Sequence, residues 1–126
     1  MKIIVDKSIA DLGKKSIVLA LAKNVDPAAK LTDAFLEERK KMEEWALGCD
    51  VEEAAKHPVN QGYRDSITAV GRSAKKNPPT AIALIQNVKR RGSLPNINSI
   101  VDIYNVETLR SFLAIGGHDF DKIDEE

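Results

Sequence analysis

The sequence predicts an α+β domain in which helices dominate, with a small sheet completed by missing strands or by a partner chain. Three observations lead to this class. Apolar side chains recur at helical spacing through residues 26–113, cap residues separate these stretches, and two short apolar runs near the N-terminus are typical of strands. Since 126 residues is about the size of one domain, we interpret 1–126 as a single domain or part of one.

The two predicted strands lie within the first 22 residues. Lys2 to Val5 is a short β-branched run, and Ser16 to Ala22 is continuously apolar after its serine, which is the pattern of a strand buried on both faces. Two strands alone do not make a stable sheet. We therefore expect the exposed edge to pair with another copy of the chain or with another polypeptide.

The first long helix is predicted to start at Asp26, because aspartate is a favoured cap and Pro27 suits the first helical position. Gly48 predicts its end. Its apolar stripe consists of Leu31, Ala34, Phe35, Met42, Trp45 and Ala46. A charged run over residues 37–44 lies between these positions, and we interpret it as a solvated face with i,i+4 ion pairs.

Three shorter helices are predicted next. Asp50 caps the first of them, and Pro58 interrupts it. The second covers residues 59–71, and a polar, basic loop follows. Pro79 then opens the third, which ends at Gly92. The apolar residues of this third helix are Ile82, Leu84, Ile85 and Val88.

Composition excludes several classes of protein. Nineteen basic and nineteen acidic side chains give a formal net charge of zero, which argues against broad, nonspecific binding of duplex nucleic acid. Cys49 is the only cysteine, so the chain has no intramolecular disulfide and no cysteine-rich zinc site, and we predict a cytoplasmic protein. His57 and His118 lack metal-ligand spacing, so we predict neither a metal nor a cofactor. The longest apolar run, residues 17–22, is far short of the ~20 residues of a membrane span.

The last predicted helix begins at Asn98 or Ser99 and ends before a pair of glycines. Asp102 and Asn105 fall in the middle of its apolar face, where an unpaired polar group costs ~2–7 kcal/mol. Both side chains are therefore expected to be hydrogen-bonded. Two interpretations are open: the side chains tie down a neighbouring loop such as residues 92–97, or they contact a ligand.

A longer pattern covers two segments, residues 94–105 (LPNINSIVDIYN) and residues 116–123 (GGHDFDKI). Together they resemble the editing module in the β subunit of phenylalanyl-tRNA synthetase. Tyr104 stands where the synthetase usually has threonine and looks like the free-standing proteins built from that module. The resemblance covers about residues 78–123. Because the family module continues into further strands and a glycine-rich segment of the pocket, we expect this chain to be truncated at its C-terminus.

The resemblance implies recognition of aminoacyl-tRNA or of its amino-acid moiety, with hydrolysis of a mischarged ester in trans as a further step. The residues predicted to bind substrate are Asn98, Asp102, Asn105, Gly116 and Gly117. His118 matches the family's histidine and is the only imidazole of the segment, a side chain often used as a general base, so it is the predicted catalytic residue.

Lys89, Arg90 and Arg91 are predicted to contact tRNA phosphates, or instead to complement the dipole of their own helix. Whether the chain is an enzyme is open at this point. The alternatives are a non-catalytic module that binds RNA or a small molecule, and an interaction domain that forms a homo-oligomer or pairs with a partner chain.

Overall fold

Helices form the regular structure of this computed structural model, which describes residues 3–14 and 16–123. Along the described chain the elements are α1 (Lys7–Asp11), α2 (Asp33–Gly48), α3 (Val51–Lys56), α4 (Pro58–Ala69), α5 (Thr80–Arg91), α6 (Ser99–Ser111) and the 3-10 helix η1 (Phe120–Lys122). The chain divides into two units, one of residues 26–117 and one of residues 1–25 with 118–126. The predicted dominance of helices is confirmed.

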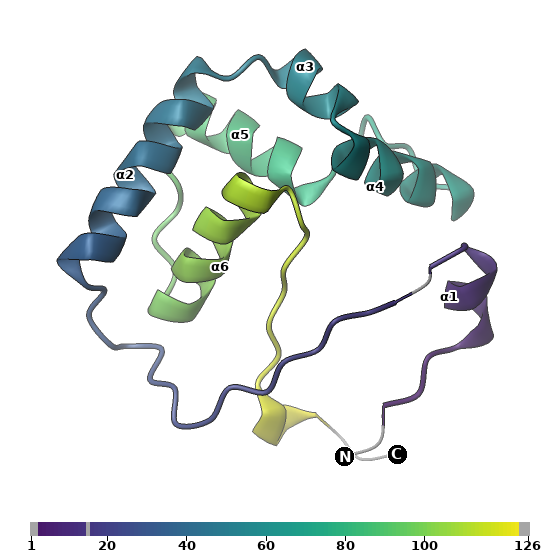
Figure 1. Cartoon of the computed structure of the whole chain (residues 1–126), viewed down its shortest axis with the longest axis horizontal. Helices are drawn as coiled ribbons and strands as arrows, with labels where there is room; N and C mark the ends of the chain where they lie inside the picture. Colours follow the sequence, from purple (N-terminus) through teal and green to yellow (C-terminus); the bar gives the residue numbers. More distant parts are fainter. Residues whose placement is uncertain (1–2, 15, 124–126) are drawn as a thin grey trace. The chain divides into compact units, whose positions relative to one another are not determined.

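The core of the 26–117 unit lies where α2, α5 and α6 pack against one another, with α3 packed on α4 and α5 (Figure 1). The loop before α6 adds Leu94 to this core, and α6 adds Val106 and Leu109. The buried side chains of α5 are Ala81, Ile82, Leu84, Ile85 and Val88. The predicted apolar face of α5 is therefore confirmed, and that of α6 is confirmed at Val106 and Leu109, whereas Leu113 follows the helix and is 50% exposed.

Local cap chemistry sets several helix ends. Asp50 Oδ1 accepts a hydrogen bond from the Glu53 amide at 3.2 Å. Gly92 ends α5 in the left-handed conformation, with a φ of 86° that favours glycine. Asn98 Oδ1 accepts a hydrogen bond from the Val101 amide at 2.9 Å, so Asn98 is the cap of α6. These ends agree with the sequence-based predictions.

α2 begins later than the sequence predicts. Its cap is Thr32, whose hydroxyl accepts a hydrogen bond from the backbone amide three residues on. The predicted start at Asp26 is wrong, because the Asp26 carboxylate closes a local turn instead. The Pro27 carbonyl accepts a hydrogen bond from the Ser99 amide. In a helix this carbonyl would accept a hydrogen bond from the amide four residues further on, but here it is paired with Ser99 of α6 instead.

Neither predicted strand forms within the described residues: Ile3 to Val5 and residues 16–22 have no strand partner. Their apolar side chains face solvent, with Ile4 78% and Val18 92% exposed. A strand is held by hydrogen bonds to a neighbouring strand, and no segment of the described chain supplies one. The predicted small sheet is thus absent from the described residues, while Lys2 lies outside them.

Candidate functional site

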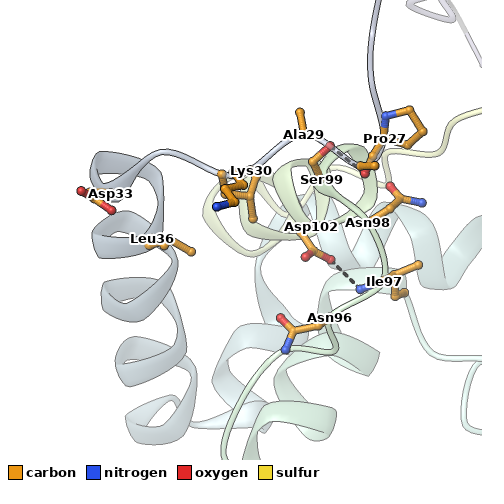
Figure 2. Close-up of a pocket in the computed structure, with 12 residues that line it drawn as sticks. Pro27, Ala29, Lys30, Asp33, Leu36, Asn96, Ile97, Asn98, Ser99 and Asp102 are labelled. Carbon is orange, nitrogen blue, oxygen red and sulfur yellow. Dashed lines mark hydrogen bonds between the residues drawn. The ribbon is translucent and has the colours of Figure 1, made fainter.

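An open groove lies at the N-terminal end of α6 (Figure 2). One wall is the segment before α2 together with the first turn of that helix, and the other is the loop into α6 with its first turn. The groove has a volume of about 600 Å³. The side chains that line it include Lys30, Leu36, Asn96, Ile97, Asn98 and Asp102.

Ser99 joins the two walls. Its amide donates a hydrogen bond to the Pro27 carbonyl at 3.1 Å (Figure 2). Its hydroxyl lies 3.1 Å from the carbonyl oxygens of both Asp26 and Pro27. The first amides of a helix lack partners inside the helix, so this contact satisfies one of them. It also fixes the segment before α2 against the start of α6.

The groove combines apolar surface with polar side chains that have no partner within the described chain. Ile97 is 60% exposed and Leu36 is 45% exposed. Lys30 and Asn96 are exposed as well, and within the described chain their side chains make no hydrogen bond or ion pair. A surface of this kind suits a ligand that has an apolar part and several polar groups.

Asp102 is buried, with 6% of its surface exposed, and forms part of the groove wall. One carboxylate oxygen accepts a hydrogen bond from the Ile97 amide at 3.0 Å (Figure 2). The other lies 3.2 Å from Nη1 of Arg39. Asp102 therefore ties down the loop before α6, as one of the two sequence-based interpretations expected. Its role as a substrate-binding residue stays a prediction.

Arg39 of α2 is the residue that sequence reasoning missed. It is only 8% exposed, and its guanidinium contacts two acidic side chains, the buried Asp102 and the partly buried Glu43, the latter from Nε at 3.0 Å. Nη2 donates to the carbonyls of Leu94 and Pro95 at 2.8 and 3.3 Å. A buried guanidinium is costly unless it is hydrogen-bonded, and here each of its three nitrogens has at least one acceptor.

A sequence signal for Arg39 was available. The charged run over residues 37–44 is predicted to be a solvated face. Arg39, however, lies four residues after Phe35, three before Met42 and seven before Ala46. Those intervals place it on the apolar stripe of α2. A charged residue at such a position needs a buried partner, and Asp102 on the apolar face of α6 is the matching acid.

The other residues predicted to bind substrate do not line the groove. Asn105 is buried, and its side chain makes no hydrogen bond within the described chain, so the expectation that it is hydrogen-bonded is wrong, whereas that for Asp102 is confirmed. A Cβ added at Gly117 would lie 3.6 Å from the Tyr104 ring, which is ordinary contact, and one added at Gly116 would meet open space. The structure therefore gives no steric reason for either glycine, and binding by these residues stays a prediction.

His118 is exposed and belongs to the other unit of the chain, which comprises residues 1–25 and 118–126. Within the described residues its imidazole has no hydrogen-bond partner. Its predicted role as a catalytic base stays a prediction.

The basic end of α5 has identifiable partners. The Lys89 ammonium donates a hydrogen bond to the Leu47 carbonyl at 2.7 Å, in the last turn of α2. The Arg90 guanidinium donates to the side chain of Asn87. Lys89 thus compensates the C-terminal carbonyls of a neighbouring helix as well as lying at the end of its own. Phosphate contact by Lys89, Arg90 and Arg91 stays a prediction.

Comparison with protein families identifies the module. The model of the B3/4 domain matches residues 62–126, just over half of the chain. The chain belongs to the B3/4 domain family. This is the domain of the phenylalanyl-tRNA synthetase β subunit, so the predicted resemblance is confirmed, and the match starts earlier than residue 78. No curated protein and no solved structure matches this B3/4 domain.

Other kinds of site find little support in the described residues. No three histidine, cysteine, aspartate or glutamate side chains among them gather as metal ligands, and no helix among them is long and apolar enough to cross a membrane. Burial raises the pKa of the Cys49 thiol, while the charge of Lys89 opposes this shift. A raised pKa disfavours the thiolate, which is the nucleophilic form of cysteine.

Proposed function

We propose that this B3/4 domain binds the aminoacyl end of a transfer RNA, or its amino-acid moiety, in the groove at the start of α6. One observation carries the proposal: the family-matched residues 62–126 include the whole α6 side of the groove, Asn96 to Asp102. The family's place in a tRNA synthetase supports a tRNA or a synthetase subunit as the partner.

The chemistry of the groove supports this ligand. An aminoacyl-adenosine end carries an amino-acid side chain, ribose hydroxyls and a phosphate. Leu36 and Ile97 offer exposed apolar surface, and Asn96 offers an uncommitted amide. Lys30 supplies a cation that can pair with a phosphate oxygen. The groove therefore matches each part of the ligand with one kind of side chain.

Calorimetric titration with a hydrolysis-resistant, amide-linked phenylalanyl- or tyrosyl-adenosine 5′-phosphate tests the proposal. We expect Ile97→Ala and Lys30→Ala each to weaken binding about fivefold, the equivalent of ~1 kcal/mol. The matched controls are Ile103→Ala on the exposed side of α6 and Lys40→Ala on α2, because neither residue lines the groove. Absence of binding by the wild-type chain, or equal losses in the control variants, contradicts the proposal.

Hydrolysis of a mischarged ester is the further step that we propose for this domain. It requires a positioned water and a base, and His118 is the candidate base. Phenylalanine tRNA charged with tyrosine should lose its amino acid faster with the wild-type chain than in buffer, and His118→Ala should abolish the difference. If the wild-type chain gives no deacylation at high concentration, the domain binds without editing.

A second candidate function is that of an interaction domain, and the exposed apolar segments favour it. Ile4, Val18 and Leu19 are 78%, 92% and 60% exposed. Unpaired backbone beside such side chains is a template for strand addition. Sedimentation should then show a homo-oligomer, and Val18→Lys should shift it toward the monomer. A monodisperse, stable wild-type monomer rules this function out.

A further inference from the structure

Arg39 lies outside the family-matched residues and does not line the groove, yet it reaches the loop that forms one groove wall. The loop over residues 94–97 has no helix or strand of its own. Three side chains make hydrogen bonds to its backbone. Arg39 donates to two of its carbonyls. Glu43 accepts from the Leu94 amide at 2.9 Å, and Asp102 accepts from the Ile97 amide at 3.0 Å.

Arg39 also joins the other two side chains, Glu43 and Asp102, so that all three form one network. Its Nε donates to the same Glu43 oxygen that accepts the Leu94 amide, and its Nη1 donates to Asp102. The planar fork of a guanidinium serves these separate directions at once, which a lysine ammonium cannot do. Without Arg39, both carboxylates lose their cation while they are still packed against the loop.

We propose that Arg39 is the positioning residue of the groove, through which the N-terminal half of the chain sets the affinity of a site built on the family-matched half. Arg39 does not contact the ligand. It fixes the loop in the conformation that presents Asn96 and Ile97, so ligand affinity depends on the guanidinium fork. This inference rests on the proposed function for its ligand, but its effect on the loop is measured without one.

The test compares Arg39→Met and Arg39→Lys with Arg110→Met in the full chain. Arg110 is a matched control, because it forms ion pairs with Glu38 and Glu107 at an exposed position on α6. Each variant is first checked for folding by its melting curve. The Ile97 amide is then followed by NMR hydrogen exchange, and the amide-linked aminoacyl-adenosine phosphate is titrated at a temperature where the variant is folded.

We expect both Arg39 variants to exchange the Ile97 amide faster and, when folded, to bind the analogue about tenfold more weakly than the wild type. Arg110→Met should leave both properties unchanged. A purely structural Arg39 would lower the melting temperature but leave the affinity of the folded protein and the Ile97 amide unaltered, which overturns the proposal. Arg39→Lys keeps the charge and decides the question if Arg39→Met does not fold.

Failure of the wild-type chain to bind the analogue overturns the proposed function rather than the positioning role. In that case, the Ile97 amide alone decides: faster exchange in Arg39→Lys than in Arg110→Met supports loop positioning, and equal exchange refutes it.

Discussion

The 26–117 unit and the segment of residues 3–25 are both rich in apolar side chains, but only the first buries them. Ile85 and Val88 are fully buried against neighbouring helices, whereas Ile4 and Val18 are 78% and 92% exposed. Apolar patterning is therefore sufficient where a helix begins at a local cap and packs against a neighbouring helix. A strand, in contrast, makes its backbone hydrogen bonds to a neighbouring strand, so it does not form without one.

The largest effect is expected at the buried charge that links α2 to α6. Arg39→Met should lower the free energy of unfolding by about 3–5 kcal/mol, because it leaves the Asp102 carboxylate as a buried charge without its cation and removes the ion pair of the partly buried Glu43. Arg110→Met, which removes an exposed cation from the same unit, should cost at most about 1 kcal/mol. Urea unfolding of the two variants measures the contrast, and equal losses would show that the buried network does not stabilise the packed unit.

A matched pair of isoleucines separates the two regions directly. Ile85→Ala in the core should cost about 2–5 kcal/mol, because it removes buried methyl groups and leaves a cavity. Ile4→Ala in the N-terminal segment should change stability by no more than about 0.5 kcal/mol. Thermal unfolding of both variants checks this. A large loss in Ile4→Ala would mean that the N-terminal segment is packed in solution, against a second copy or another surface.

Helix caps provide a smaller contrast. Asn98→Ala should cost about 1 kcal/mol, since α6 packs in the core and loses its cap hydrogen bond. Asp6 caps the five-residue α1, which has no buried residue, so Asp6→Ala should leave global stability unchanged. Denaturant titration of both variants gives the comparison. A loss in Asp6→Ala as large as that in Asn98→Ala contradicts it.

The smallest effect concerns exposed carboxylates. The Lys41 ammonium, by hydrogen bond and by charge, lowers the pKa of the Glu38 carboxyl, and the Ser8 side chain and amide lower that of Asp6. A lowered pKa in the folded state gives stability that is present above the unfolded pKa and lost as the pH falls through the folded one. NMR titration of Lys41→Met should return the Glu38 pKa toward its ordinary value while leaving Asp6 unchanged. An unaltered Glu38 pKa would refute the assignment of its cause.

Much of the helical unit could be predicted from the sequence because its signals are local. Helix ends are marked by the cap residues Asp50, Gly92 and Asn98. The position of Asp102 and Asn105 on the apolar face of α6 indicates that both are buried. The start of α2 could not be predicted in this way, because Ser99 captures the Pro27 carbonyl from 72 residues away.

The groove was predicted only in part for the same reason. Asn98 and Asp102 were singled out and do line it, while Lys30 and Asn96 enter it only through the packing of α2 beside α6. Arg39 was overlooked because charged neighbours in the sequence hid its place on the apolar stripe. The sheet was predicted from two short apolar runs, and an apolar run does not supply a strand with a partner.

Chemical-shift mapping of the wild-type chain determines where the ligand binds. Amide signals are recorded while the amide-linked phenylalanyl-adenosine phosphate is added. We expect saturable shifts concentrated at residues 27–36 and 96–102, the two walls of the groove. Saturable shifts that leave both walls unchanged, or no shifts at millimolar ligand, would contradict this expectation.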